Sequence, residues 1–278
     1  MIGPYCFFNH ELIPVEQAVV PVDDIHFSYG YGVYETLKVR HRVLYFPSLH
    51  EERLFHSASV IGLAHPFKEG AVIRGIRKLV QANRTDHANI KVLLIGGDTA
   101  EQARLYILTL NPLFPDRKLY KQGAIALIHP GERVFPEAKT LNMLVSTLAF
   151  REARSVGAYD AVLKNREGCL TEGTRTNLFY VKGGVVYTPP RQQVLEGVTR
   201  ITLLDMLHQR GIPVKERPLH ESEIPHQDGF FLTSTSSKVM PLKRLGSQEV
   251  PIPSLIRDIK KYYDTYLDTY ASSQEVLF

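Results

Sequence analysis

Apolar and polar residues alternate with a period of two along several short stretches, which is the pattern of half-buried β-strands. Turn residues bound each stretch, so the pattern predicts two pairs of neighbouring strands in the first 110 residues. The first pair is joined near His41, and the second pair is joined by the loop 96–103. The four expected strands are residues 33–40, 42–46, 90–95 and 104–110.

Two stretches of the same part of the chain repeat their apolar residues at helical spacing. A helix is expected over residues 49–62, because Ser48 and Glu51 have the spacing of a capping box just before it. A second helix is expected over residues 68–83. Its apolar side consists of Val72, Ile76, Leu79 and Val80.

The same two periods continue beyond residue 120. Residues 111–120 lie between the two parts, contain two prolines and three charges, and are predicted to be a linker between domains. Helices are expected over residues 143–156, 197–210 and 256–270, and glycines at 157 and 211 stop the first two. Strands are expected over residues 124–129, 160–164, 170–172, 177–181, 185–187, 230–233 and 239–242.

Composition and charge exclude several classes of protein. The formal net charge of +4 is spread along the chain without a basic stripe, which argues against a nucleic-acid partner. Cys6 and Cys169 stand far apart with no histidine at metal spacing, so neither a disulfide framework nor a metal site is expected. No apolar run approaches the roughly 20 residues of a membrane span, and no secretory signal opens the chain. A cytoplasmic protein without a membrane partner is expected.

Lys139 is the first candidate for chemistry. It follows a polar turn and precedes the apolar run 141–148, where an ammonium group is costly. A lysine in such surroundings can act as an amine nucleophile or form a Schiff base with a carbonyl. From composition alone, the alternative of a surface lysine near a helix start is favoured, and only the motifs below change that balance.

Six motifs occur in one order along the chain, and together they resemble the class IV aminotransferases, which are the fold type IV pyridoxal-phosphate (PLP) enzymes. The family includes D-amino-acid and branched-chain aminotransferases. The resemblance extends from Phe8 to about Leu242, and each motif alone is weak. The motifs are YGYGVYETLKV (29–39), HEERLFHSA (50–58), AKTLN (138–142), LTEGTRTNLF (170–179), LEGVTR (195–200) and FLTSTSSKVMP (231–241).

The resemblance implies an α+β (α/β two-domain) fold. Residues 1–110 would form a smaller N-terminal α/β domain. Residues 121–278 would form a larger C-terminal domain that resembles a β-barrel with helices and carries the PLP lysine. A homodimer is also implied, and the small-molecule partners would be an amino acid and a 2-oxo acid.

The resemblance assigns Lys139 as the catalytic Schiff-base lysine and Glu172 as the partner of the cofactor's ring nitrogen. Leu195 would pack on the ring. Gly197, Val198 and Thr199 would bind the phosphate, since a helix N-terminus offers free N–H groups and a positive dipole. In isolation, an exposed turn glutamate before Gly173 is a reasonable alternative explanation of Glu172. The other implied cofactor-binding residues are Arg53, Ser234, Thr235 and Ser236.

The resemblance leaves the amino donor open. The D-amino-acid branch carries Arg-x-His in the loop that here is residues 96–103, and this short loop has neither residue. The branched-chain branch prefers arginine at the positions of Lys38 and Lys91, whereas residues 234–237 follow the D-amino-acid pattern. The candidate substrate-binding residues are Tyr34, Lys38, Lys91 and Arg175.

Two functions follow from these residues. The first is a transaminase that moves an amino group between a branched-chain L-amino acid or a D-amino acid and a 2-oxo acid such as 2-oxoglutarate. The alternative is an aminodeoxychorismate lyase on the same fold, which makes 4-aminobenzoate. That branch tends to place Asn-Arg-Leu after the lysine, whereas this chain has Asn142-Met143-Leu144.

Overall fold

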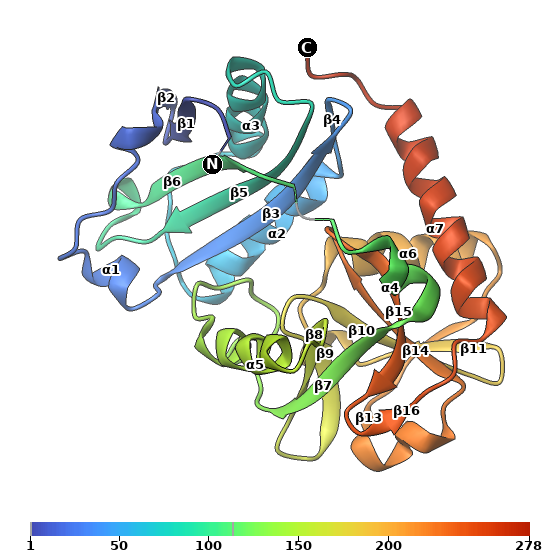
Figure 1. Cartoon of the computed structure of the whole chain (residues 1–278). Coiled ribbons are helices and arrows are strands. Elements are labelled where there is room, and N and C mark those ends of the chain that lie inside the picture. The colour runs from blue at the N-terminus through green and yellow to red at the C-terminus, as the bar shows by residue number, and fades with distance from the viewer. Residues whose placement is uncertain (1, 113) are drawn as a thin grey trace. The chain divides into compact units, whose positions relative to one another are not determined.

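The computed structural model describes residues 2–112 and 114–278, which form two compact units. The first unit comprises Met1–Leu113, Ala138–Asn142 and Ala271–Phe278, and the second comprises Phe114–Glu137 and Met143–Tyr270. Each unit has a sheet and a buried core of its own (Figure 1).

The first unit contains an antiparallel sheet in the order β2-β1-β6-β5-β3-β4. The four predicted strands are present as β3 to β6. The sequence pattern missed β1 and β2, because four-residue strands are too short to show a clear period. The strands are β1 (Tyr5–Phe8), β2 (Glu11–Pro14), β3 (Gly32–Arg40), β4 (Val43–Leu44), β5 (His87–Ile95) and β6 (Arg104–Leu110).

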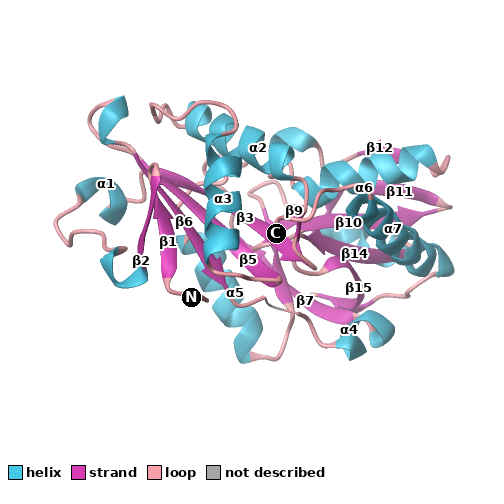
Figure 2. Cartoon of the chain, turned by 90° about the horizontal axis from the view of Figure 1, so that it is seen from above, coloured by secondary structure: helices cyan, strands magenta, loops and turns pink. Residues whose placement is uncertain are grey.

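Helices α2 (Pro47–Val60) and α3 (Ala71–Ala82) pack against this sheet and against each other (Figure 2). Alternate residues of β3, such as Val33, Leu37 and Val39, join the core beneath them. The predicted apolar side of α3 is buried there as expected. Residues of β3 with even numbers, including Tyr34 and Lys38, therefore point to the other face of the sheet. The short helix α1 (Ile25–Ser28) precedes β3.

The predicted capping box at the start of α2 is wrong. The helix begins at Pro47, and its N-cap residue is Phe46 rather than Ser48 and makes no side-chain cap. Glu51 is instead buried and accepts hydrogen bonds from the backbone N–H groups of Gly70, Val72 and Ile73, at 2.6, 2.8 and 3.2 Å. The carboxylate thus stabilises the N-terminus of α3 rather than that of its own helix, because tertiary packing brings the second helix start within reach.

The second unit contains a sheet that closes into a barrel. Its central order is β10-β14-β15-β7-β8-β9, and the pair Asn177↔Glu172 between β10 and β9 closes the ring. β11 and β12 extend the sheet from β10. The strands are β7 (Ala124–Pro130), β8 (Asp160–Lys164), β9 (Cys169–Gly173), β10 (Asn177–Lys182), β11 (Val185–Thr188), β12 (Val214–Glu216), β13 (Leu219–His220), β14 (Gly229–Ser234), β15 (Lys238–Leu245) and β16 (Gln248–Glu249).

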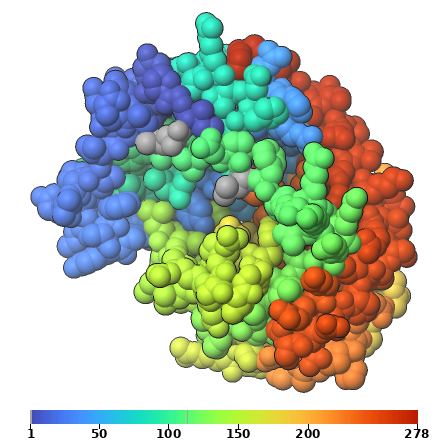
Figure 3. Space-filling model, in the orientation of Figure 1, coloured from blue at the N-terminus to red at the C-terminus, as the bar shows by residue number. Residues whose placement is uncertain are grey.

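Helices cover the outside of this barrel. α5 (Leu144–Ser155) packs on β7 and β8, and α6 (Val198–Gln209) packs on β14 and β12. α7 (Ser254–Ser272) buries Tyr263, whose hydroxyl lies 2.7 Å from Thr202 Oγ1 of α6. The outer side of α7 lies on the surface of its unit (red in Figure 3). α4 (Arg117–Gln122) precedes β7. The 3-10 helices are Val15–Gln17, Ala100–Gln102, Arg191–Gln193 and Glu221–His226.

Two segments group with the first unit although they follow the second unit's first strand. The segment Ala138–Asn142 carries Lys139, which the sequence placed in the second domain. In Ala271–Phe278, Leu277 joins the core of the first unit. The predicted linker 111–120 includes Leu113, which lies outside the described residues, and its last four residues belong to α4. The division into domains at residues 110 and 121 stays a proposal.

Candidate active site

The segment Ala138–Asn142 lies along the edge of β3 that β4 leaves open. Tyr34 N–H donates to Lys139 C=O at 2.9 Å, and Leu141 N–H donates to Gly32 C=O at 2.8 Å. A β-carbon at Gly32 would stand 2.7 Å from Leu141 Cδ1 and 2.8 Å from Leu94 O. Only glycine therefore lets the segment approach β3 this closely.

Lys139 is held from its other side by α2. The hydroxyl of Ser57, fully buried, accepts the Lys139 N–H at 3.0 Å and donates to the Arg53 carbonyl at 2.7 Å. The half-buried ammonium group of Lys139 lies 4.5 Å from the centre of the Tyr34 ring, and that of Lys91 lies 5.0 Å from the same centre. Three predicted residues, Lys139, Tyr34 and Lys91, are thus brought together in the first unit.

Arg53 has a partner that the sequence did not predict. Its Nε and Nη2 donate to the two carboxylate oxygens of Glu35 at 2.6 and 2.7 Å. His50 Nδ1 lies 2.8 Å from Glu35 Oε2, and both Glu35 and His50 are almost fully buried. A two-point contact of this kind holds the plane of the guanidinium in one orientation.

Burial and charge act in opposite directions on this cluster. Burial alone would raise the pKa of Glu35, but the charges and hydrogen bonds of Arg53 and His50 bring it well below its ordinary value. Burial lowers the pKa of His50, although Glu35 opposes that shift. The two shifts together favour the carboxylate form of Glu35 and disfavour the protonated form of His50.

Glu172 is buried at the end of β9 in the second unit, with 3% of its surface exposed. Its Oε2 accepts the Leu195 N–H at 3.2 Å, and Arg133 Nη1 stands 3.6 Å from its Oε1. The exposed-turn explanation of Glu172 is therefore wrong. The carboxyl group thus has a backbone N–H donor and a guanidinium close to it although it is buried.

The helix α6 begins two residues after Leu195. Its N-cap residue is Gly197, which has no side chain to cap the N–H groups of the first turn. Val198 and Thr199 are buried. In the same unit Ser234 Oγ accepts the Ser237 N–H at 3.1 Å and so closes the turn between β14 and β15, with Thr235 and Ser236 half-buried at its tip.

Arg175 lies in the turn between β9 and β10. Its side chain is exposed and stacks on the Phe150 ring, with the guanidinium carbon 3.8 Å from the ring centre. Below it the fully buried Asp160 accepts hydrogen bonds from the hydroxyls of Thr174 and Thr176 and holds the turn. Burial raises the pKa of Asp160, and those hydroxyls and the charge of Arg175 oppose the shift.

Two further regions bear on the predicted set. In the loop 96–103, Asp98 is exposed and lies 3.3 Å from His26, and Gln102 Oε1 accepts the Asp98 N–H at 2.9 Å. This short loop contains no lysine, arginine or histidine that could bind a carboxylate.

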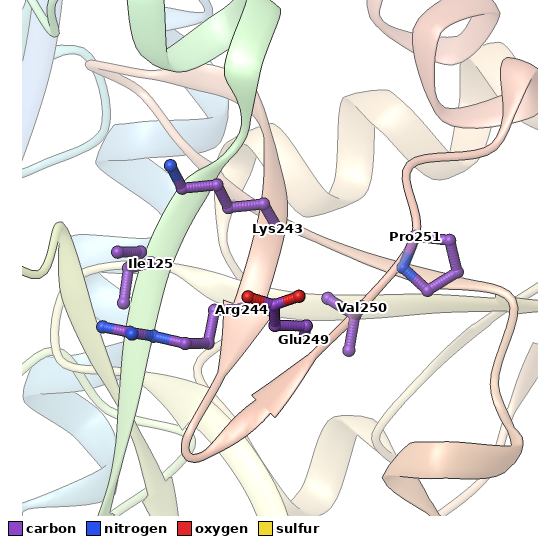
Figure 4. A pocket seen from close by; sticks show the side chains of 6 residues that line it. All are labelled: Ile125, Lys243, Arg244, Glu249, Val250 and Pro251. Carbon is purple, nitrogen blue, oxygen red and sulfur yellow. The ribbon is translucent and has the colours of Figure 1, made fainter.

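A hollow of about 530 Å³ beside β7 and β15 contains none of the predicted residues (Figure 4). It is lined by Ile125, Lys243, Arg244, Glu249, Val250 and Pro251.

The residues of each unit fit the chemistry of PLP. A phosphate group requires N–H donors with positive potential, which the start of α6 after Gly197 supplies. A pyridine nitrogen requires a buried acceptor, which Glu172 supplies. An aldehyde requires an amine, and Lys139 has one on a rigid backbone. Among the described residues there is no cluster of histidine, cysteine and carboxylate side chains suited to a metal ion.

Three residues that support this set were missed in the sequence. They are Glu35, which binds Arg53, Ser57, which binds the Lys139 backbone, and Asn177, whose amide lies 3.5 Å from Glu172. All three stand inside quoted motifs, Glu35 at 29–39, Ser57 at 50–58 and Asn177 at 170–179, so their presence there was the available signal. Their contacts cross between elements and have no spacing rule in the sequence.

Comparison with known proteins gives consistent matches. The family model for amino-transferase class IV matches residues 32–245. A D-alanine aminotransferase from Bacillus licheniformis is 28% identical over 87% of this chain and 89% of its own length. A putative branched-chain-amino-acid aminotransferase from Methanocaldococcus jannaschii is 26% identical over 94% of this chain and 95% of its own.

The solved structures agree with these matches. The structure of a branched-chain aminotransferase from Thermoproteus uzoniensis with norvaline has a TM-score of 0.89 at 24% identity, over 99% of both chains. This likeness confirms the predicted α+β architecture with a barrel-like sheet. Among the residues that the structure describes, no helix has both the length and the apolar character needed to cross a membrane.

Proposed function

Because the chain belongs to the class IV aminotransferase family and is thus a PLP-dependent transaminase, we propose that its donor is a branched-chain L-amino acid or a D-amino acid and its acceptor a 2-oxo acid such as 2-oxoglutarate. When bound, PLP supplies an aldehyde that accepts amino groups and a protonated ring that withdraws electrons. The relatives include aminotransferases of both substrate kinds.

The proposal assigns tasks at the cofactor to Lys139, Tyr34 and Leu195. Lys139 holds the cofactor's aldehyde carbon and afterwards moves the substrate's α-proton through its Nζ. Its backbone bonds to β3 and to Ser57 keep that amine in one place. The aromatic ring of Tyr34 packs against the same amine. Leu195 provides an apolar wall in the second unit, where it is buried.

The phosphate is proposed to bind at the start of α6, through the N–H groups of Val198 and Thr199. Arg53, Thr235 and Ser236 are proposed to add charge and hydroxyl donors, as the resemblance implies. Since Glu35 already binds two nitrogens of Arg53, the arginine acts in a fixed orientation rather than as a mobile cation.

The observation that carries this proposal is the placement of Glu172. Its carboxylate is buried and bound to the N–H of Leu195, two residues before the open end of α6. One short segment thus connects an acceptor for the ring nitrogen with donors for the phosphate. Burial of a carboxylate is costly, so a glutamate without a ligand or partner to bind would be expected in solvent rather than beside this helix start.

Replacement of Glu172 by glutamine tests the role of the carboxylate. Glu172→Gln should retain PLP and lose about 10²–10⁴-fold in the rate of proton transfer, measured as conversion of the bound cofactor to its amine form. Glu167→Gln is the control, because Glu167 is exposed in the preceding hairpin turn. An unchanged rate in Glu172→Gln would refute the assignment.

The donor is tested with both enantiomers of alanine, leucine and valine against 2-oxoglutarate and pyruvate.

Arg175, exposed above Phe150, is the proposed contact for the donor's carboxylate, with Lys38 and Lys91 as the other candidate cations. Arg175→Ala should raise KM for amino acids and leave KM for 1-phenylethylamine unchanged, since that amine has no carboxylate. An equal effect on both would assign Arg175 to the fold or the cofactor.

The lyase alternative is not favoured by the comparisons, whose named relatives are aminotransferases. Incubation of the PLP-loaded protein with an amino acid alone separates the two functions, because only a transaminase then converts its bound cofactor to the amine form. A homodimer and a cytoplasmic location complete the proposal.

A further inference from the structure

One side chain touches both parts of the proposed PLP site in the second unit. Asn177 is the first residue of β10, where it pairs with Glu172 of β9 and with Thr233 of β14. It therefore stands where the barrel closes. Its side chain is 5% exposed, so an amide without partners would be costly there.

The amide is bound on its donor side. Its Nδ2 donates to the Leu195 carbonyl at 2.7 Å and lies 3.5 Å from Glu172 Oε2. The Leu195 N–H donates to that same Oε2 at 3.2 Å. The amide, the carboxylate and one peptide unit thus form a closed triangle of polar contacts, in which the position of each group depends on the other two.

The acceptor side of the amide lies against the start of α6. A β-carbon built on Gly197, the N-cap residue, would stand only 2.1 Å from Asn177 Oδ1. No other residue type can therefore occupy position 197 while the amide keeps its place. The turn from Leu195 to Gly197 wraps around this one side chain.

From these contacts we propose that Asn177 is a positioning residue that fixes the Glu172 carboxylate relative to the first turn of α6. This inference rests on the proposed function, in which Glu172 binds the ring nitrogen of PLP and α6 binds its phosphate. Asn177 touches neither group and acts through the two elements that do. Without the amide, the carboxylate can rotate about its side chain, and the turn before α6 loses one of its anchors.

The test compares Asn177→Ser, which shortens the side chain, with Asn177→Asp, which keeps its size but puts a second carboxylate beside Glu172. Thr188→Val is the matched control, because the buried Thr188 hydroxyl donates to Leu178 C=O at 2.9 Å in the same unit without contact to Glu172. Thermal unfolding of the apoprotein reports the general cost of a lost buried hydrogen bond in each variant.

Two further readouts separate positioning from general stability. The dissociation constants for PLP and for pyridoxal, measured by equilibrium dialysis, report how much of the affinity depends on the phosphate. The pH midpoint of the absorbance change of the bound cofactor reports the surroundings of the ring. Both are measured in the wild type and in the Glu172→Gln background.

Asn177→Ser should weaken PLP binding about tenfold to a hundredfold and pyridoxal binding less, since the hydrogen bonds of the amide to Glu172 and to the Leu195 carbonyl are lost. Its pH midpoint should shift in the wild-type background and stay unchanged beside Glu172→Gln. Asn177→Asp should shift the midpoint further, and it serves for all readouts where the serine variant does not fold.

Three results would overturn the inference: wild-type affinity and midpoint in both Asn177 variants, a midpoint shift that persists beside Glu172→Gln, or equal effects from Thr188→Val. A wild-type protein that fails to bind PLP would overturn the proposed function itself and this inference with it. Wild-type binding with silent Asn177 variants leaves the function standing and removes only the role of Asn177.

Discussion

At the scale of single residues, the buried charges of the first unit each have a named partner. Glu35 binds Arg53 through two oxygens, and His50 shares one of them. A buried carboxylate without such partners would be strongly destabilising, since its desolvation would be uncompensated. The proposed phosphate contact of Arg53 is therefore supported by a pair of residues beneath it, and both belong to elements that the sequence pattern predicts.

Lys139 is predicted to be the lysine that holds PLP. Borohydride treatment of the loaded protein should attach the cofactor to the peptide that contains Lys139, as measured by mass spectrometry after digestion. Lys139→Ala should abolish the label. Lys91→Ala is the control, because Lys91 lies beside the same Tyr34 ring but on β5. A label on Lys91 or Lys164 would contradict the assignment.

His50 is predicted to make folding sensitive to mild acid. Its pKa in the folded chain is lowered by burial, whereas an unfolded histidine titrates near pH 6.5. Below about pH 6.5 the unfolded chain therefore binds the additional proton, and stability that is present above this pH is lost as the pH falls toward the folded pKa.

The free energy of unfolding in urea, measured from pH 7.5 to 5, should fall less steeply in His50→Gln than in the wild type. The difference in slope is at most about 1.4 kcal/mol per pH unit, which is the value for one proton. His56→Gln, in the same helix but exposed, should keep the wild-type slope. Parallel curves for His50→Gln and wild type would exclude the effect.

At the scale of elements, the two helices of the first unit are joined by a carboxylate rather than by their apolar sides alone. Glu51 of α2 accepts three backbone N–H groups at the start of α3. The helix N-terminus has no side-chain cap from its own N-cap residue, Gly70. Glu51 therefore replaces the local cap with a tertiary one.

Glu51→Gln is predicted to lower the free energy of unfolding by about 2 kcal/mol, since hydrogen bonds to a charged group contribute roughly 1.5–3 kcal/mol. Glu52→Gln is the matched control, because Glu52 is the next residue of the same helix and is exposed. It should stay within about 0.5 kcal/mol of the wild type. Urea denaturation at pH 7 measures both, and equal effects would show that the carboxylate of Glu51 has no special role.

At the scale of the whole molecule, we predict a homodimer, as the family resemblance implies and as closed two-fold assembly favours. Sedimentation velocity of the PLP-loaded protein should give the mass of two chains of 31.5 kDa. Transaminase activity per chain should fall when dilution drives the protein into monomers. A monomer of full activity would contradict the prediction.

Much of the fold could be predicted because it depends on local periodicity. The strands 33–40 and 104–110 and the helix 68–83 differ from β3, β6 and α3 by a few terminal residues at most. Several short strands, among them β1, β13 and β16, were missed because two to four residues show no clear period, whereas β4 and β11 were predicted as parts of hairpins. Motif order predicted the family, which the match over residues 32–245 confirms.

The sequence by itself determined which residues carry chemistry, since a lysine, a carboxylate and a helix start have the same reactivity wherever the chain places them. Only the tertiary structure decided their partners. Glu51 caps a helix other than its own, Glu35 holds Arg53, and Asn177 joins Glu172 to the start of α6. Such contacts form between elements distant along the chain or across a strand pair, where packing rather than spacing sets the distance. The chemistry is therefore a property of residue types, and its geometry is a property of the folded chain.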